Sequence, residues 1–523
     1  MLLSNPADTT RTGIKFTRRN DLDPATRLYI AYTALTAQMF GLWGTVTQLS
    51  RDYAISRTFV YMLANTLEES MPVMFGPAVA YTQTLEERNI SIQLLLSLRL
   101  EGKCSIDGVS TIMKRIGAGI SSAGLISRLL TETGKLLPDT LETGSDSLEY
   151  VVYLSDEIFA HSVPILITVE PASSAILKIE LADNRKADQW KKHFESIQNN
   201  GYIPWLLVTD EGPGLCTAHA DILSDVTRQP DTYHAVAHTL GQWANRLEQA
   251  AYKAISVEYN CEQKLNSAKS DLVVEKRLDA YFCAVNISID SIKRYEDFCY
   301  LYSNIIKNLQ PFDKAGNLRN RKKAEKNIDA ALDLIIELNH AGITKQVMKV
   351  KRVLPELLNY FDTAELVISE CKDIAIDGET LKTLCVAWQW EKEAVKSKNI
   401  KRKQRALKEE LFYLEFAEGN IQDGYHYIKQ KVYRKLDKIV QSSALVECIN
   451  SIIRPYLNTS RNHITQEQLN LIMFYHNHRR YHAGKRKGYT PMEILTGIKQ
   501  EKDWTDIIID IIREKSPGLL LNL

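Results

Sequence analysis

Apolar periodicity separates a short β-rich stretch from long helical regions on either side of it. Apolar and β-branched residues form four short runs that predict strands, at 148–159, 163–171, 174–182 and 202–210. Between the third and fourth runs, residues 184–201 place Trp190 and Phe194 four positions apart and end at Gly201, as an amphipathic helix does. The fourth run is nearly all apolar, so we expect its strand in the middle of a sheet.

Helical periodicity dominates the rest of the chain. From about residue 236 to residue 440 the pattern is almost entirely helical. A stretch of this length is too long for a loop, so residues 259–440 are interpreted as an all-helical insertion. Further helices are predicted at 441–456, 465–481 and 502–514.

The segment 47–67 has the pattern of a helix-turn-helix. Its apolar positions have the spacing that two packed helices need: Leu49, Tyr53, Ile55, Val60 and Leu63. Ser56 is suited to cap the second helix, which leaves Arg57, Thr58 and Tyr61 in the turn that contacts base edges in this motif. We favour DNA binding by these three residues; a plain helical hairpin is the alternative.

A second pattern of the same kind follows at 104–135, where Ser121 or Ser122 would cap a helix that carries Arg128. Two such units in series would read a longer DNA site, because each reads only a few base pairs. The alternative is a four-helix structural subdomain. Residues 137–147 are rich in Pro, Gly, Ser and acidic side chains and are interpreted as a linker.

Composition places the chain among ordinary globular proteins. A chain of 523 residues is long enough for roughly three or four units. No run approaches the roughly 18 apolar residues of a membrane span, and the first residues lack the regions of a signal peptide, so we expect a cytoplasmic protein and no membrane partner. The eight cysteines are scattered without a C-x-x-C pair, which argues against a disulfide framework or a zinc finger.

The net charge of +1, from 65 Lys and Arg against 64 Asp and Glu, gives no support to nucleic-acid binding by itself. The distribution of charge says more. Basic clusters recur in the second half of the chain, at 319–326, 398–408, 429–438 and 478–487. Any one of them could be a solvated helix face, but four together favour a surface that binds the phosphate backbone.

Two aspartates follow predicted strands. Asp156 is expected at the end of the first strand and Asp210 at the end of the fourth, so the carboxylates would emerge side by side if those strands are neighbours. Adjacent carboxylates repel each other unless a cation is bound, and hard divalent ions prefer oxygen ligands. An Asp at a strand end is more often only a turn residue. Its neighbours Glu157 and Glu211 are the fallback candidates.

Glu447 is the natural third carboxylate. It is predicted on a helix with Asn450, Ser451 and Arg454 on the same face, so a metal-binding acid and a phosphate-seeking guanidinium point the same way. With three carboxylates, two Mg²⁺ or Mn²⁺ ions could activate an attacking oxygen and stabilise a leaving one at a phosphodiester.

Histidines and aromatic residues offer further candidates. Asp231, His234 and His238 lie at a predicted helix start and are interpreted as a capped helix with satisfied histidines, the alternative being a supporting role at the scissile phosphate. Four aromatic residues of the insertion could stack on flipped bases but are more often core residues: Trp388, Trp390, Tyr425 and Tyr427.

Five motifs carry a resemblance to a known family. They are SDEIF at 155–159, VTDEGPGL at 208–215, DTYH at 231–234, ALVECINSIIRPYL at 444–457 and FYHNHRRYHAGKRKGYTPMEILTG at 474–497. Together they resemble bacterial insertion-sequence transposases of the DDE type, relatives of retroviral integrases. The resemblance implies metal binding by Asp156, Asp210 and Glu447 and a DNA-phosphate contact by Arg454. The sequence departs from the pattern at Cys448, where Asn is expected, and in the long separation of Asp210 and Glu447.

The resemblance implies a multidomain α+β protein with an RNase H-like α/β catalytic core, interrupted by the all-α insertion and followed by a helical C-terminal tail. The expected organisation is a helical DNA-binding region (1–136), linker (137–147), first part of the core (148–258), insertion (259–440), second part of the core (441–497) and C-terminal helix (498–523).

The implied activity is metal-dependent cleavage and strand transfer of DNA. Double-stranded DNA would be bound as element ends and target, by a homo-oligomer in the bacterial cytoplasm at the nucleoid. In the cluster 478–487 the expected DNA-binding residues are Arg479, Arg480 and Lys485. Two other functions stay open, a non-catalytic DNA-binding regulator derived from a transposase and a helical scaffold without a DNA role.

Overall fold

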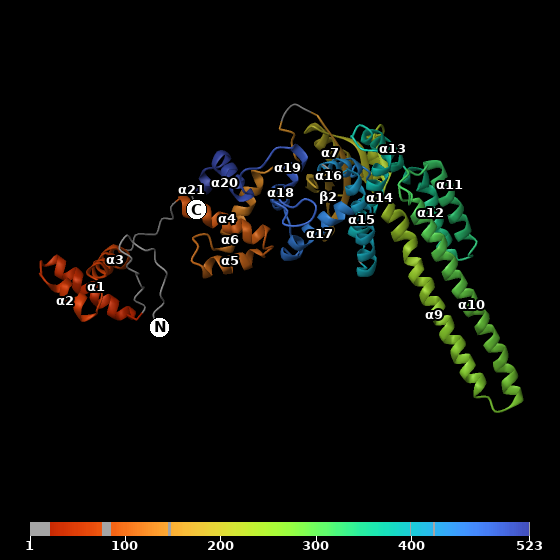
Figure 1. The fold of residues 1–523 in the computed structure, drawn as a ribbon, viewed down its shortest axis with the longest axis horizontal. Helices are drawn as coiled ribbons and strands as arrows, with labels where there is room; N and C mark the ends of the chain where they lie inside the picture. Colours follow the sequence, from red (N-terminus) through yellow and green to blue (C-terminus); the bar gives the residue numbers. More distant parts are fainter. Residues whose placement is uncertain (1–20, 76–84, 145–147, 398, 422–423, 522–523) are drawn as a thin grey trace. The chain divides into compact units, whose positions relative to one another are not determined.

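The computed structural model describes residues 21–75, 85–144, 148–397, 399–421 and 424–521 (Figure 1). The chain forms two compact units, Met1–Thr84 and Leu85–Leu523. The described residues are mostly helical and contain one five-stranded mixed sheet, which confirms the predicted α+β multidomain class. No helix within these ranges is long and apolar enough to cross a membrane. Residues 145–147 of the predicted linker and 522–523 of the predicted C-terminal helix lie outside the described residues.

In the described part of the first unit, residues 21–75, the chain forms three helices: α1 (Pro24–Met39), α2 (Thr45–Asp52) and α3 (Arg57–Phe75). Leu49, Ile55 and Val60 are buried between them together with Ile30 of α1, as the spacing of apolar residues predicts. The Ser56 hydroxyl accepts a hydrogen bond from the Phe59 amide at 3.1 Å, which confirms the predicted cap at the start of α3.

The five strands lie in the second unit, in the order β3-β2-β1-β4-β5. β2 pairs antiparallel with β1 and β3, whereas β4 pairs parallel with β1 and β5. The strands are β1 (Glu149–Ala160), β2 (Val163–Val169), β3 (Ile176–Leu181), β4 (Tyr202–Thr209) and β5 (Thr227–Pro230). The four predicted strands are confirmed. β5 was not predicted because its sequence, TRQP, has no apolar alternation.

Alternate residues of β1 face different helices, since successive side chains of a strand point to opposite sides. On one side, Tyr153 stacks on Phe194 of α7 (Ala187–Asn199), which packs against α8 (Pro213–Ile222). On the other side, Asp156 contacts Asn450 of α17 (Ala444–Thr459). The sheet is therefore covered on both faces, and its apolar strands are buried.

Helices from both ends of the second unit share the core of the sheet. They are α4 (Leu85–Leu100), α5 (Ile106–Arg115), α6 (Ala123–Lys135), α18 (Gln466–His478), α19 (Pro491–Thr496), α20 (Trp504–Lys515) and α21 (Gly518–Leu521). Ser122 caps α6 as predicted. α6 approaches α18 so closely that a Cβ at Gly134 would lie 2.2 Å from the Glu467 carbonyl oxygen. The predicted 1–136 region is thus divided between the two units.

The helices between β5 and α17 form a second hydrophobic core, which we call the helical insertion (233–440). They are η1 (Tyr233–His238, a π-helix), α9 (Thr239–Asn266), α10 (Asp271–Asn308), α11 (Arg321–Ile336), α12 (Ala341–Leu357), α13 (Tyr360–Cys371), α14 (Gly378–Lys396), α15 (Ile400–Ile421) and α16 (Tyr425–Leu436). Its helical character is as predicted, and α9 runs across the boundary expected at residue 258. The ends of the insertion meet where the Thr232 amide donates to the Gln441 carbonyl at 3.0 Å.

Candidate active site at the ends of two parallel strands

The parallel register of β1 and β4 brings the two candidate aspartates level with each other. Leu154 pairs with Val208 across this register, so Asp156 and Asp210 each lie two residues further along neighbouring strands. Asp210 directly follows the end of β4, as predicted. The prediction that Asp156 ends its strand is wrong, because the antiparallel pairing with β2 carries β1 on to Ala160. Asp156 therefore lies within β1, at the point where β4 stops.

Asp156 and its neighbour Glu157 face opposite sides of the sheet. The Asn450 side-chain amide donates to Asp156 Oδ2 at 2.8 Å from α17. Glu157 instead forms an ion pair with Arg185 at 3.0 Å, just before α7. The expectation that the neighbouring glutamate points away from the candidate site is confirmed.

The Asp156 carboxyl lies in a buried and negatively charged environment. Burial raises its pKa to about 7, and the nearby charges of Asp210, Glu157 and Glu447 act in the same direction. Asp210 and Glu447 are therefore close enough to act on Asp156 electrostatically. An excess of carboxylates of this kind is what a bound cation or a proton relieves.

Asp231 fixes the start of α17 to the end of β5. Asp231 is 2% exposed. Oδ2 accepts hydrogen bonds from the amide and hydroxyl of Ser443, the residue before α17, and the amide bond is 2.8 Å long. Oδ1 accepts from the amides of Tyr233 at 2.6 Å and His234 at 3.1 Å. Asp231 caps the helical segment as predicted, and it also joins two segments that the insertion separates.

This joint places His234 against Glu447. His234 Nε2 lies 2.7 Å from Glu447 Oε1, and the His238 ring lies 5.9 Å from the His234 ring. The hydrogen bonds from Ser443 to Asp231 hold the start of α17 beside the end of β5. Glu447, in the first turn of α17, therefore lies within reach of η1, which begins at Tyr233. The preferred interpretation of His234 as a satisfied histidine did not foresee this contact. The DTYH motif after β5 was the only signal for it in the sequence.

The three carboxylates do not converge on one point in this conformation. Within the described ranges, no group of three or more His, Cys, Asp or Glu side chains is placed to hold a metal ion. The oxygen donors nevertheless suit a hard cation: Asp156 and Asp210 lie on neighbouring strands, and the buried Asn450 Oδ1 has no hydrogen-bond partner among the described residues. The Glu447 side chain is 44% exposed, so it has room to reorient.

The acid next to Asp210 is engaged in an ion pair with an arginine. Glu211 forms an ion pair with Arg228 at 2.9 Å, and Arg228 also contacts Glu356 of α12. Asp210 itself accepts a hydrogen bond from the Gly212 amide at 2.9 Å. Glu211, like Glu157, is held by an arginine, so Asp156 and Asp210 remain the better candidates for a cation site.

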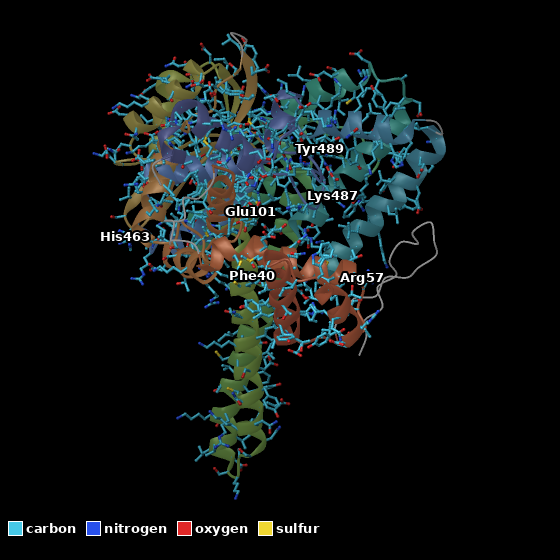
Figure 2. All side chains as sticks on the ribbon, turned by 90° about the vertical axis from the view of Figure 1, so that its left-hand side faces the viewer. Phe40, Arg57, Glu101, His463, Lys487 and Tyr489 are labelled. Atoms are coloured by element: carbon cyan, nitrogen blue, oxygen red, sulfur yellow. The ribbon has the colours of Figure 1, made fainter. Side chains whose placement is uncertain are left out.

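The positions expected to contact DNA lie in several parts of the chain. Arg57, Thr58 and Tyr61 are exposed in the first turns of α3, and Arg57 is visible at the surface in Figure 2. Arg128 is exposed on α6 in the second unit. Arg454 is exposed on α17, two turns after Glu447. Only Arg454 shares an element with a candidate catalytic residue.

The basic tail after α18 is largely engaged within the chain. Arg480 pairs with Glu493 at 2.8 Å, and Glu493 completes a capping box with Thr490 at the start of α19. Lys485 pairs with Asp437 at 2.7 Å and with Glu391 of α14 at 3.3 Å. These ion pairs give the basic tail a structural role. The Arg479 guanidinium instead lies over two aromatic rings, 5.5 Å from the centre of the Tyr475 ring and 5.7 Å from that of Tyr481.

The aromatic residues of the insertion divide into core and surface. Trp388 is 3% exposed, and its Nε1 donates to Asp437 at 2.9 Å. Tyr425 is also buried, so the preferred interpretation of both as core residues is confirmed. Trp390 is half-buried, and Tyr427 is exposed.

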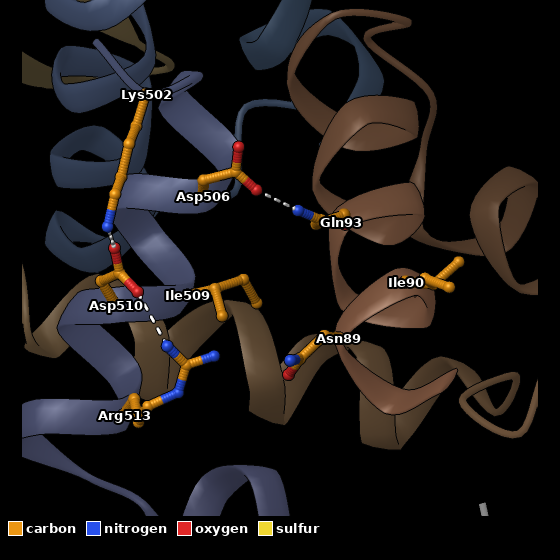
Figure 3. A pocket seen from close by; sticks show the side chains of 8 residues that line it. All are labelled: Asn89, Ile90, Gln93, Lys502, Asp506, Ile509, Asp510 and Arg513. Atoms are coloured by element: carbon orange, nitrogen blue, oxygen red, sulfur yellow. Dashed lines mark hydrogen bonds and ion pairs between the residues drawn. The ribbon is translucent and has the colours of Figure 1, made fainter. Parts of the chain in front are cut away.

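A cavity of about 410 Å³ lies elsewhere, between α4 and α20 (Figure 3). Most of its polar groups are paired with one another: Gln93 donates to Asp506 at 2.6 Å, and Asp510 accepts from Arg513 at 2.8 Å. The buried Asn89 Oδ1 has no hydrogen-bond partner among the described residues. None of the predicted site residues lines it. The strand ends, rather than this cavity, are the better candidate for chemistry.

No protein-family model and no curated protein matches the chain. Among solved structures, it is similar to the Drosophila P element transposase strand transfer complex, with 11% identity and a TM-score of 0.28 over 73% of this chain and 100% of that one. With a TM-score this low, the residues of the site themselves have to carry the functional assignment.

Proposed function

We propose that the chain is a metal-dependent DNA transposase of the DDE type, whose sheet is an RNase H-like core and whose helical insertion separates Glu447 from the two aspartates. The observation that carries this proposal is the position of Asp156 and Asp210, which lie level with each other along two parallel strands, with Glu447 near enough for its charge to raise the pKa of Asp156. A buried carboxylate is rarely surrounded by further acids unless a cation or a proton neutralises their charge.

The sheet supports the proposal through its topology. Three antiparallel strands followed by two parallel ones, in the order β3-β2-β1-β4-β5, correspond to the arrangement expected of an RNase H-like core. In this sheet one carboxylate, Asp156, lies within the central strand β1, and the other, Asp210, directly follows the neighbouring strand β4. α17 then brings the third acid from the far side of the insertion.

Asp156, Asp210 and Glu447 would hold two Mg²⁺ or Mn²⁺ ions. When bound, the ions would activate the attacking oxygen and stabilise the leaving one. In the cleavage step, water attacks the phosphorus and the 3′ oxygen leaves as a hydroxyl. In the joining step, that hydroxyl attacks a target phosphodiester and displaces its 3′ oxygen.

The chain's own residues would orient this site. Asn450 holds the Asp156 carboxylate, and the Asp231–Ser443 joint sets the position of Glu447. His234 holds Glu447 and would release it to the site when the cations bind. Arg454 would contact a DNA phosphate, while Arg57, Thr58 and Tyr61 would read base edges from a helix-turn-helix and Arg128 would support a second one.

A supercoiled plasmid that carries the DNA flanking the coding region provides the test. The wild-type chain should nick or cut the plasmid in Mg²⁺, and Asp210→Asn should bind the same DNA nearly as well but leave it uncut. Glu211→Gln is the matched control, because the neighbouring acid is held by Arg228 and should not be needed for cleavage. Full cleavage by Asp210→Asn would refute the assignment.

A non-catalytic DNA-binding regulator is the second candidate. The observation in its favour is that Glu447 is engaged by His234 rather than directed to the aspartates. A regulator would shift the plasmid in a gel, with an affinity that falls steeply as salt rises, but would not cut it under any metal condition. A shift without cleavage by the wild-type chain would therefore favour this candidate.

A further inference from the structure

The two longest helices of the insertion form a hairpin whose large apolar side chains point outward. α9 and α10 lie side by side and extend away from the other helices of residues 85–523 (Figure 1). Midway along the hairpin, the buried residues of the seam between them are small: Ala251 and Ala254 from α9, and Ala284 and Ser288 from α10. Small residues let the helices approach closely, but they bury little apolar area.

Larger apolar residues form one stripe on each helix. On α10 the spacing of four, four and seven residues aligns Val274, Leu278, Phe282 and Ile289, which are 38%, 38%, 55% and 55% exposed. On α9 the spacing of three and four residues aligns Tyr252, Ile255 and Tyr259, which are 67%, 41% and 59% exposed. We call these seven residues the hairpin stripe.

Both halves of the hairpin stripe lie on the same broad face. With a rotation of about 100° per residue, each half of the stripe lies roughly 110° around its helix from the seam residues. The turn has the same sense in both helices when each is viewed from its N-terminus. Because the two helices run antiparallel, an equal turn in the same sense brings both halves to one side. The level of Ile255 along the hairpin corresponds to that of Phe282, so the two halves also lie side by side.

The opposite face has a different character. Ile287 and Val257 are exposed there, 54% and 46%, but they are surrounded by charged residues such as Lys253, Lys276 and Arg294. Three basic residues lie in sequence between the first and last members of the hairpin stripe: Lys253, Lys276 and Arg277. At about 100° per residue, none of them falls on the face that carries the stripe. A DNA backbone would need positive charge, so the stripe is suited to an apolar partner.

We propose that the hairpin stripe is the interface with a second copy of this chain, in which two hairpins pack face to face as a four-helix bundle. With about 180 Å² per large apolar residue, the exposed fractions sum to roughly 650 Å² per copy. A standard interface buries about 800 Å² per partner, so the stripe and its rim provide the area that a stable dimer needs. An apolar stripe is also complementary to itself, as a two-fold interface requires.

The molecular mass in solution without DNA tests this inference, so it does not depend on the proposed chemistry. At micromolar concentration the full chain should sediment as a dimer of about twice 59.5 kDa. Ile289→Glu puts a charge into each half of the interface and should weaken the dimer by about 100-fold or more, because both copies lose a buried side chain. Ile287→Glu is the matched control, with the same residue type, helix and exposure on the opposite face, and should remain a dimer.

A second matched pair tests the other helix. Tyr259→Glu, in the stripe of α9, should dissociate the dimer, and Val257→Glu, on the opposite face, should not. Circular dichroism of each variant checks that the hairpin is still helical. A monomeric wild-type chain would refute the inference, as would a dimer that Ile289→Glu and Tyr259→Glu leave intact, or equal loss of the dimer in both members of each pair.

Discussion

Replacing Asp231 with asparagine should loosen the joint between β5 and α17 without changing its shape. The wild-type carboxylate accepts four hydrogen bonds, two on each oxygen, from Ser443, Tyr233 and His234. In asparagine one of the two oxygens becomes an amide nitrogen that cannot accept. If the amide nitrogen points toward Tyr233 and His234, both of those hydrogen bonds are lost. If it points toward Ser443, the bond from the Ser443 amide is lost and a donor faces a donor there, whereas the Ser443 hydroxyl can rotate and accept, so at least one of the four bonds is lost.

The size of the effect follows from the lost bond and from the loss of the charge. One hydrogen bond to a charged group contributes about 1.5–3 kcal/mol, and the bonds that remain are weaker because their acceptor is now neutral, so the total loss is about 3 kcal/mol. Asp231 is almost fully buried, so water cannot replace the lost partners. At about 1.4 kcal/mol for each factor of ten, the start of α17 should open about 100-fold more often.

Hydrogen exchange measured by mass spectrometry is the suitable assay, because a chain with two units is not expected to unfold in one step. Amides of residues 443–450 should exchange about 100-fold faster in Asp231→Asn, whereas those of β2 should be unchanged. Asp225→Asn, in an exposed turn before β5, is the matched control and should have no effect. Unchanged exchange at 443–450 in Asp231→Asn would show that the carboxylate does not anchor α17.

Two further predictions concern the core of the sheet. His476 is buried and its Nε2 contacts the Ser174 carbonyl oxygen at 2.8 Å; burial lowers its pKa to about 4, from 6.5. Protonation therefore favours the unfolded chain, and about 3 kcal/mol of folding free energy should be lost as the pH falls from 6.5 to 4. Thermal melting over this pH range should show a smaller loss in His476→Gln, which has no group that titrates there. Gly134→Ala should reduce the free energy of unfolding by about 1–3 kcal/mol, and so lower the melting temperature, because the new Cβ meets the Glu467 backbone. Gly124→Ala on the same helix meets nothing and should raise it slightly; equal shifts would contradict the close approach of α6 to α18.

Local patterns account for what could be predicted from the sequence. The first four strands are apolar or β-branched runs, and the helices at 444–459 and 466–478 have clear periodicity, so the strands and helices lie close to their predicted positions. Glu447 and Asn450 share a face of α17 for the same local reason. Patterns within a few residues determine these features, and a single sequence displays them.

Contacts between distant segments could not be predicted. β5 is a strand only because it pairs with β4 and is covered by α12, and its four residues carry no pattern of their own. The same applies to the hydrogen bond between Asp231 and Ser443, which are 212 positions apart. Asp156 was expected at a strand end because the sequence does not show how far the β1–β2 hairpin continues beyond β4.

The position of the insertion also sets the order in which the candidate site can form during synthesis. Thr232 and Gln441, at its two ends, are 209 positions apart, yet the Thr232 hydroxyl donates to the Gln441 carbonyl at 2.7 Å. At about 5–20 residues per second, a ribosome needs roughly 10–40 s to add that much chain. During this time β1 to β5 are complete, but the face of the sheet that α17 covers has no partner. An insertion with its own hydrophobic core can fold in that interval, so that Ser443 emerges next to an Asp231 that is already in place.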